Sequence, residues 1–247
     1  MTTHDFGAGL VPAHQHQNPD GSVGGWVANT ATVSATATVG PNACVYGSAR
    51  VCGNAWITSN ARVYGNAKIF GNAQISNSAR IYGSACIYDH ARVSGRAQIY
   101  GSARICGSVR INGSARIYGN ARVCGNARVF GNAHISGSAD VYGHAQVYDN
   151  AKVFGTAQVY GDAQVSNNAQ ISSTSHIIWG YSGGYNYTTY RLQDGRIWLQ
   201  YGCESHPLSW WLSQDLEALC FKHKHDEKHV PFVSAAIHMA NLLTSHN

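Results

Sequence analysis

The chain has 247 residues, only 12% of which are charged, and a formal net charge of +5. No apolar run approaches the roughly 18 residues of a membrane-spanning helix, and the first residues lack the basic start of a signal peptide, so we expect neither. The seven cysteines are an odd number and have no paired spacing in the repeat described below. This pattern favours reduced thiols and a cytoplasmic location.

Residues 1–30 are rich in proline, glycine and histidine. We expect them to form an N-terminal cap, because the first coil of a repeat stack needs a cover. Trp26 and Val27 are expected to plug the open end of the core.

From residue 31 to residue 174, one six-residue word repeats 24 times without an insertion. We number the six positions of the word as slots one to six. They hold Ala, any residue, Val or Ile, any residue, Gly, and Asn or Ser, as from Ala61 to Asn66. Val109 is the one departure in slot one. The alternation of apolar slots one and three with polar slots is typical of a β-strand. Glycine in slot five tolerates positive φ and predicts a sharp corner. The word therefore predicts short strands joined by corners and stacked in coils.

This word resembles that of the hexapeptide-repeat superfamily, in which a small residue stands two places before an aliphatic one in every six. The resemblance covers residues 31–174. It implies an all-β solenoid, a left-handed parallel β-helix of about eight three-sided coils with three words in each. At about 4.8 Å per coil, this helix would be roughly 38 Å long. The entry segment Gly21–Val27 and the words after it are also similar to bacterial and phage-encoded hexapeptide-repeat proteins of uncertain function.

Residues 175–247 differ in composition and predict a small C-terminal α/β cap of one hairpin and two helices. The segments Tyr187–Leu192 and Arg196–Tyr201 flank Asp194-Gly195, which is a strong hairpin signal. Apolar residues at helical spacing predict the helices: Leu208, Trp211, Leu212, Leu216 and Leu219 for the first, and Phe232, Ala236, Met239 and Leu243, after Pro231, for the second.

With three words per coil, residues 18 apart stack in columns on the outside. One face then carries tyrosines from Tyr46 to Tyr118, and arginines recur in slot two of all three faces. Residues 31–174 hold 12 Lys and Arg against four Asp, a difference of 12 − 4 = 8 positive charges, and residues 50–128 hold 11 bases against Asp89 alone. We expect no column of carboxylates that could form ion pairs with these bases. Either solvent and salt screen them, or an anionic partner does.

Two interpretations of the columns remain open. In the first, tyrosines and arginines only cover the walls and keep the solenoid soluble. In the second, guanidinium groups bind phosphates and phenol rings stack on bases. The candidate ligand-binding residues are Arg62, Arg80, Arg92, Arg104, Arg110, Arg116, Arg122, Arg128, Tyr64, Tyr82, Tyr100 and Tyr118.

The function favoured by the sequence is a non-enzymatic binding scaffold in the cytoplasm, with a phage origin suggested by the resemblance. Its anionic partner would be a nucleotide signal, a nucleic acid or an acidic protein. The alternatives are an acyltransferase of the hexapeptide class and a purely structural assembly module. We expect no cofactor, and a homo-oligomer, a trimer by family analogy, formed through the tyrosine wall.

Other chemistry has weaker support. His90, His134 and His144 lie in the repeat, but His90 and His144 are three coils apart, about 14 Å, and no loop is extruded that could build a catalytic site. The pairs Cys203-x-x-His206 and Cys220-x-x-His223 have a spacing that zinc accepts, yet we expect no metal. Cys106 and Cys124 stack within disulfide reach, and a reducing compartment favours free thiols.

Overall fold

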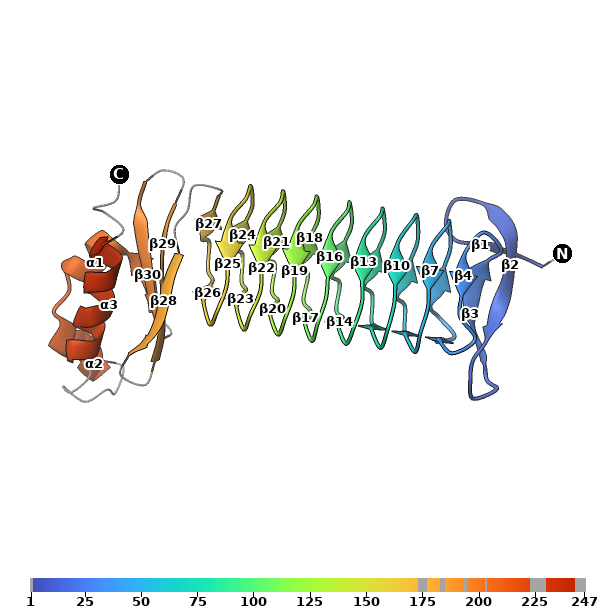
Figure 1. The fold of residues 1–247 in the computed structure, drawn as a ribbon, viewed down its shortest axis with the longest axis horizontal. Helices are drawn as coiled ribbons and strands as arrows, with labels where there is room; N and C mark the ends of the chain where they lie inside the picture. Colours follow the sequence, from blue (N-terminus) through green and yellow to red (C-terminus); the bar gives the residue numbers. More distant parts are fainter. Residues whose placement is uncertain are drawn as a thin grey trace.

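The computed structural model describes residues 2–172, 177–182, 185–192, 195–202, 204–222 and 230–242. Figure 1 shows an elongated molecule in three parts: a cap of strands at the N-terminal end, a stack of coils, and a C-terminal unit of a sheet and helices. Among the described helices, none is long and apolar enough to cross a bilayer.

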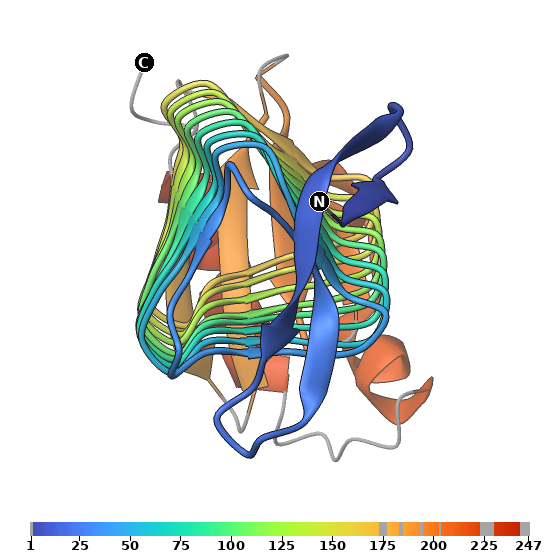
Figure 2. The same cartoon turned by 90° about the vertical axis from the view of Figure 1, so that its right-hand side faces the viewer.

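The stack of coils consists of two-residue strands, one for each word, and the strands form three parallel sheets along the long axis. Viewed from the N-terminal end, the coils superpose on a three-sided outline (Figure 2). The predicted solenoid of about eight three-sided coils is confirmed.

In the coil stack, each sheet takes every third strand, and the first sheet also includes the strands of the N-terminal cap. The first sheet contains β1 (Thr3–Asp5), β2 (Leu10–Gln17), β3 (Val23–Ala28), β6 (Cys44–Val45), β9 (Arg62–Val63), β12 (Arg80–Ile81), β15 (Gln98–Ile99), β18 (Arg116–Ile117), β21 (His134–Ile135), β24 (Lys152–Val153) and β27 (Gln170–Ile171). The second contains β4 (Thr32–Val33), β7 (Arg50–Val51), β10 (Lys68–Ile69), β13 (Cys86–Ile87), β16 (Arg104–Ile105), β19 (Arg122–Val123), β22 (Asp140–Val141) and β25 (Gln158–Val159). The third contains β5 (Thr38–Val39), β8 (Trp56–Ile57), β11 (Gln74–Ile75), β14 (Arg92–Val93), β17 (Arg110–Ile111), β20 (Arg128–Val129), β23 (Gln146–Val147) and β26 (Gln164–Val165).

Backbone hydrogen bonds between consecutive coils hold these short strands. In one word, the N–H of Arg62 donates to the carbonyl of Ala79 (3.0 Å), that of Tyr64 to Ile81 (2.9 Å), and that of Asn66 to Gly83 (2.7 Å). Residues 18 apart are therefore in register, and each coil satisfies the backbone of the next.

The core contains the residues of slots one and three. They are fully buried in the middle coils, including Ile105 and the exceptional Val109. The corners require positive φ: Gly95 has φ +70°, and a Cβ there would lie 2.6 Å from the carbonyl oxygen of Gly113. Asn77 takes the same conformation at φ 58°, which agrees with the tolerance of asparagine for this region.

The N-terminal cap closes the first coil differently from our expectation. Val27 is buried in the solenoid core, but Trp26 packs outside it with Phe6 and stacks on His4 at 4.6 Å, so the prediction for Trp26 is wrong. Its strand β3 pairs with β6 in register Trp26↔Cys44, which places Trp26 in an outward-facing slot. Asn18 covers the open edge instead: its side-chain oxygen accepts from the N–H of Val39 (2.9 Å), and its amide donates to the carbonyl of Val39 (3.3 Å).

The C-terminal cap contains an antiparallel sheet of β28 (Ile177–Ser182), β29 (Tyr185–Arg191), β30 (Ile197–Tyr201) and β31 (Glu204–Pro207). The segments expected to form a hairpin correspond to β29 and β30, while Asp194 lies outside the described residues. The sheet contacts the last coils through apolar side chains, among them the buried Tyr190, and through polar groups. The N–H of Gln164 donates to the hydroxyl of Thr188 (2.8 Å), and the amide of Gln200 donates to the hydroxyl of Tyr148 (2.7 Å).

The described part of the cap also contains α1 (Leu208–Leu212), α2 (Leu216–Lys222) and α3 (Val230–Leu242). Helices α1 and α3 contact the sheet, and α2 contacts α3. The prediction of a single helix from Leu208 to Leu219 is wrong, because the segment is divided into α1 and α2. The carboxylate of Asp215 accepts from the N–H groups of Glu217 (3.0 Å) and Ala218 (3.2 Å) and starts the second of these helices. The second helix expected after Pro231 is confirmed as α3. Of the apolar residues that predicted it, Ala236 is buried, Phe232 is exposed and Leu243 lies outside the described residues; the other buried residues of α3 are Val233, Ile237 and Ala240.

Candidate anion-binding surface

The third sheet presents a ladder of three arginines on consecutive strands. Arg92 pairs with Arg110, and Arg110 with Arg128, in exact coil register. All three side chains are exposed. In the part of the chain that the structure describes, no carboxylate oxygen lies within 4.0 Å of their guanidinium groups. The 18-residue period thus concentrates unpaired positive charge on one face, as the sequence predicts. We call Arg92, Arg110 and Arg128 the arginine ladder.

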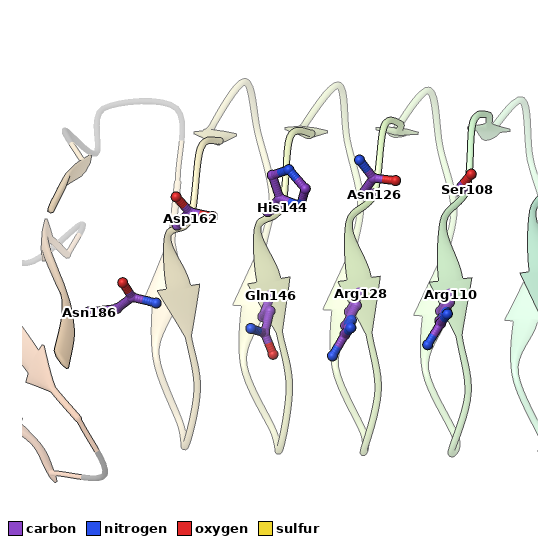
Figure 3. Close-up of a pocket in the computed structure, with 8 residues that line it drawn as sticks. All are labelled: Ser108, Arg110, Asn126, Arg128, His144, Gln146, Asp162 and Asn186. Atoms are coloured by element: carbon purple, nitrogen blue, oxygen red, sulfur yellow. The ribbon is translucent and has the colours of Figure 1, made fainter. Parts of the chain in front are cut away.

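A groove of about 410 Å³ runs along this face. Figure 3 shows two rows of side chains along the axis, one at the corner and one on the strands, with Asn186 of β29 at the end nearest the C-terminal cap. The corner row is Ser108, Asn126, His144 and Asp162, and the strand row is Arg110, Arg128 and Gln146. Positive charge therefore lies toward the middle of the solenoid, and the single carboxylate lies toward the cap. An anion in this groove would occupy the arginine end.

The first sheet carries the tyrosine column. Rings of Tyr46, Tyr64, Tyr82, Tyr100 and Tyr118 stack in sequence with centroids 4.9, 4.9, 4.8 and 5.0 Å apart and nearly parallel planes. Phe6 of the N-terminal cap extends the stack, with its centroid 4.7 Å from that of Tyr46. Burial raises the pKa of the first four phenols, while nearby arginines partly oppose this.

These rings are half-buried rather than exposed. Because each ring covers the face of the next, the wall offers ring edges and hydroxyl groups to a partner. The homo-oligomer that we expect to form through the tyrosine wall stays a prediction. Arg62, Arg80 and Arg116 flank the column and are exposed.

The second sheet differs from the expectation in two ways. Nε of Arg122 lies 3.7 Å from Oδ1 of Asp140 on the next coil, so this arginine has a carboxylate as its ion-pair partner. Cys106 and Cys124 form a disulfide, with their Cα atoms 4.6 Å apart. The expectation of free thiols at these two positions is wrong, because the coil spacing brings slot-four sulfurs within bonding distance. Arg104 remains exposed beside this pair.

A comparison with known families agrees with this geometry. A family model described as "YdcK Beta solenoid repeat" matches residues 115–127 and 121–137. The chain is a β-solenoid repeat protein. A comparison with curated proteins found no match.

The histidines of the solenoid are separate from one another. His90 contacts the side-chain amide of Asn72 (3.3 Å), and His144 lines the groove. Burial, followed by the charges of Arg116 and Lys152, lowers the pKa of His134. Among the described residues, no hydrogen bond or ion pair joins one of these histidines to another or to a carboxylate.

The described residues contain no group of three His, Cys, Asp or Glu side chains that could hold a metal ion. Of the two zinc-like pairs, Cys203 and His223 lie outside the described residues. Their partners have other contacts: Cys220 is buried in the cap core, and Nε2 of His206 lies 2.6 Å from a carboxylate oxygen of Glu204.

The sequence missed the groove residues Ser108, Asn126, Gln146, Asp162 and Asn186. The first four share columns with the ladder or its corner, so the 18-residue period could have found them. Asn186 comes from the cap, and nothing in the repeat indicates its position.

Proposed function

We propose that this solenoid is a non-enzymatic scaffold that binds an anionic partner on the arginine ladder. The observation that carries the proposal is the register of Arg92, Arg110 and Arg128 on β14, β17 and β20 without an ion-pair partner among the described residues. Like charges stacked about 4.8 Å apart repel by roughly 0.9 kcal/mol per pair even in bulk water. A partner with repeated negative charge would remove this repulsion.

Phosphate is the chemistry that best suits the ladder. A guanidinium group donates two parallel hydrogen bonds to a phosphate and remains charged at all relevant pH values. The neighbouring Ser108, Asn126 and Gln146 add hydrogen-bonding groups along the groove. Because the same contact repeats from coil to coil, we expect little base specificity. Nucleotide signals, nucleic acids and acidic proteins are the partner classes to be separated by experiment.

A binding titration tests this proposal. The probes are heparin, single-stranded DNA, RNA, linear and cyclic nucleotides, and a polyglutamate peptide, at low and at physiological salt. We expect phosphate polymers or heparin to bind at low salt and to weaken steeply as salt rises, because counterions are released. If no probe binds at low salt, the arginines serve only to keep the solenoid soluble, and a structural assembly module is favoured.

Two single charge reversals separate the ladder from general electrostatics. Arg110→Glu removes the central rung. Lys68→Glu makes the same charge change at an exposed slot-two position on the second sheet. We expect the first variant to weaken heparin binding at least tenfold and the second to weaken it less than threefold. Equal losses would mean that net charge, and not the ladder, determines binding.

We further propose that the coils belong to the hexapeptide-repeat superfamily, with left-handed winding; the gapless word from residue 31 to residue 174 supports this. The phage origin, the cytoplasmic location and the homo-oligomer stay predictions. The disulfide Cys106–Cys124 weighs against a reducing compartment. The acyltransferase alternative would require turnover of acetyl-coenzyme A, which a thiol-release assay measures.

A further inference from the structure

The ring column on the first sheet is interrupted at one coil. In slot four, the five tyrosines end at Tyr118, the next coil carries Ser136, and the coil after that carries Phe154. Strand β21 lies between β18 and β24 in unbroken register, with His134 paired to Arg116 on one side and to Lys152 on the other. The backbone therefore continues normally, and only the ring is absent at Ser136.

At Ser136 the column position between two aromatic residues carries no ring. Neighbouring rings in the column are 4.9 Å apart, so two coil steps separate the column positions of Tyr118 and Phe154 by about 9.8 Å. A flat ring placed midway would lie about 4.9 Å from each, which is within the range of offset aromatic stacking. Tyr118, Ser136 and Phe154 are all half-buried, so such a ring would be partly removed from water. We call this position the Ser136 gap.

Positively charged residues occupy slot two on the two coils that flank the gap. Slot two precedes slot four by two residues, about 6.6 Å along a strand. On that column, Arg116 and Lys152 are exposed one coil above and one coil below His134. Burial, and then the charges of Arg116 and Lys152, lower the pKa of His134 and so favour its neutral form. An anion attached to the inserted ring would meet two positive charges and an imidazole.

We propose that the Ser136 gap binds a planar aromatic ring that carries an anionic group, of the class of a nucleoside monophosphate. The ring stacks between Tyr118 and Phe154, and the phosphate lies between Arg116 and Lys152. This site is on a different sheet from the arginine ladder. It goes beyond the proposed function and uses none of the residues of the arginine ladder. The ligand is either a free nucleotide or the base and phosphate of a single strand.

Adenosine monophosphate is the probe for a calorimetric titration, with adenosine, inorganic phosphate and an oligodeoxyadenylate as comparisons. We expect adenosine monophosphate to bind at least tenfold more tightly than either of its parts. Tighter binding of the oligonucleotide, per site, assigns the ligand to a strand, and tighter binding of the mononucleotide assigns it to a free nucleotide. Binding of neither overturns the proposal.

The decisive variant fills the gap. Ser136→Tyr supplies the missing ring in a column that already accepts tyrosine, so it should fold, and circular dichroism melting checks this. The matched control is Ser76→Tyr, a slot-four serine of similar exposure on the third sheet. We expect the first to weaken adenosine monophosphate binding at least tenfold and the second to change it less than twofold. Unchanged binding by folded Ser136→Tyr would overturn the site.

Two further variants keep the proposals apart. Lys152→Glu should weaken adenosine monophosphate binding and leave heparin binding at the ladder within twofold, and Arg110→Glu should do the reverse. If heparin binds but adenosine monophosphate does not, the Ser136 gap fails and the ladder stands. If adenosine monophosphate binds in the gap but no polyanion binds, the ladder fails and the gap stands.

Discussion

Substitutions at Ile105 test the inward-facing column on which the whole solenoid depends. Ile105 is fully buried and lies in register between Ile87 and Val123. Ile→Val should cost about 0.5–1.5 kcal/mol of unfolding free energy, and Ile→Ala about 2–5 kcal/mol, because a cavity remains. Ile105→Asp should cost more than either, since it buries a carboxylate that has no partner in a column of aliphatic side chains. The predicted order of destabilisation is Val, then Ala, then Asp.

The assay is urea unfolding together with amide hydrogen exchange. Because each coil contacts only its neighbours, exchange should accelerate first in the coils around residue 105 and least in the caps. Ser102→Asp is the control, as it places the same carboxylate on an exposed slot-six position of the preceding word. We expect it to change stability by less than about 0.5 kcal/mol. A melting temperature of Ile105→Asp equal to that of the wild type would refute an inward-facing Ile105.

Three other predictions concern the ends and the outer columns. Asn18→Ala should lower the unfolding free energy by roughly 2–6 kcal/mol, because it leaves the buried N–H and carbonyl of Val39 without partners. Urea unfolding measures this loss. A loss below about 1 kcal/mol would contradict the role of Asn18 in covering the edge of the first coil. The raised pKa of phenols in the tyrosine column, such as that of Tyr82, favours the neutral phenol in the fold. This stabilisation is complete below about pH 10 and is lost as pH rises through the raised pKa. Phenolate absorbance and the urea midpoint, followed together against pH, check it; titration of all tyrosines at the ordinary pKa would count against it. Reduction of the Cys106–Cys124 bond, which spans 18 residues, should cost about 3 kcal/mol. Alkylation of protein taken directly from cells shows whether the bond exists there, and full labelling of both thiols would support a reducing compartment.

Most of the solenoid follows from the sequence, because its word has no insertion. Once three words make a coil, the register of Arg92 with Arg110 and the stack from Tyr46 to Tyr118 are fixed by arithmetic. The same 18-residue period places Asp140 beside Arg122 and Cys106 beside Cys124. The ion pair was missed because the count of unpaired bases covered residues 50–128, and Asp140 lies beyond them. The disulfide was missed because we expected a reducing compartment, although the two thiols lie within bonding distance.

The ends could not be predicted in the same way. Asn18 covers the backbone of Val39 across 21 residues, and no period relates the two positions. Asn186 reaches the groove because the sheet of the C-terminal cap packs on the last coils, which is a tertiary contact without a local signal. Helical spacing located the segment from Leu208 to Leu219 but could not show that Asp215 divides it, since apolar periodicity does not report capping.

The salt dependence of binding to single-stranded DNA tests the central claim most directly. Each phosphate contact to a single strand contributes about −0.7 to the slope of log K against log salt concentration. Reversal of Arg92, Arg110 and Arg128 to glutamate should therefore weaken binding and reduce the magnitude of the slope by about 2. A triple variant that retains the affinity and the slope of the wild type would contradict an anion-binding role for the arginine ladder.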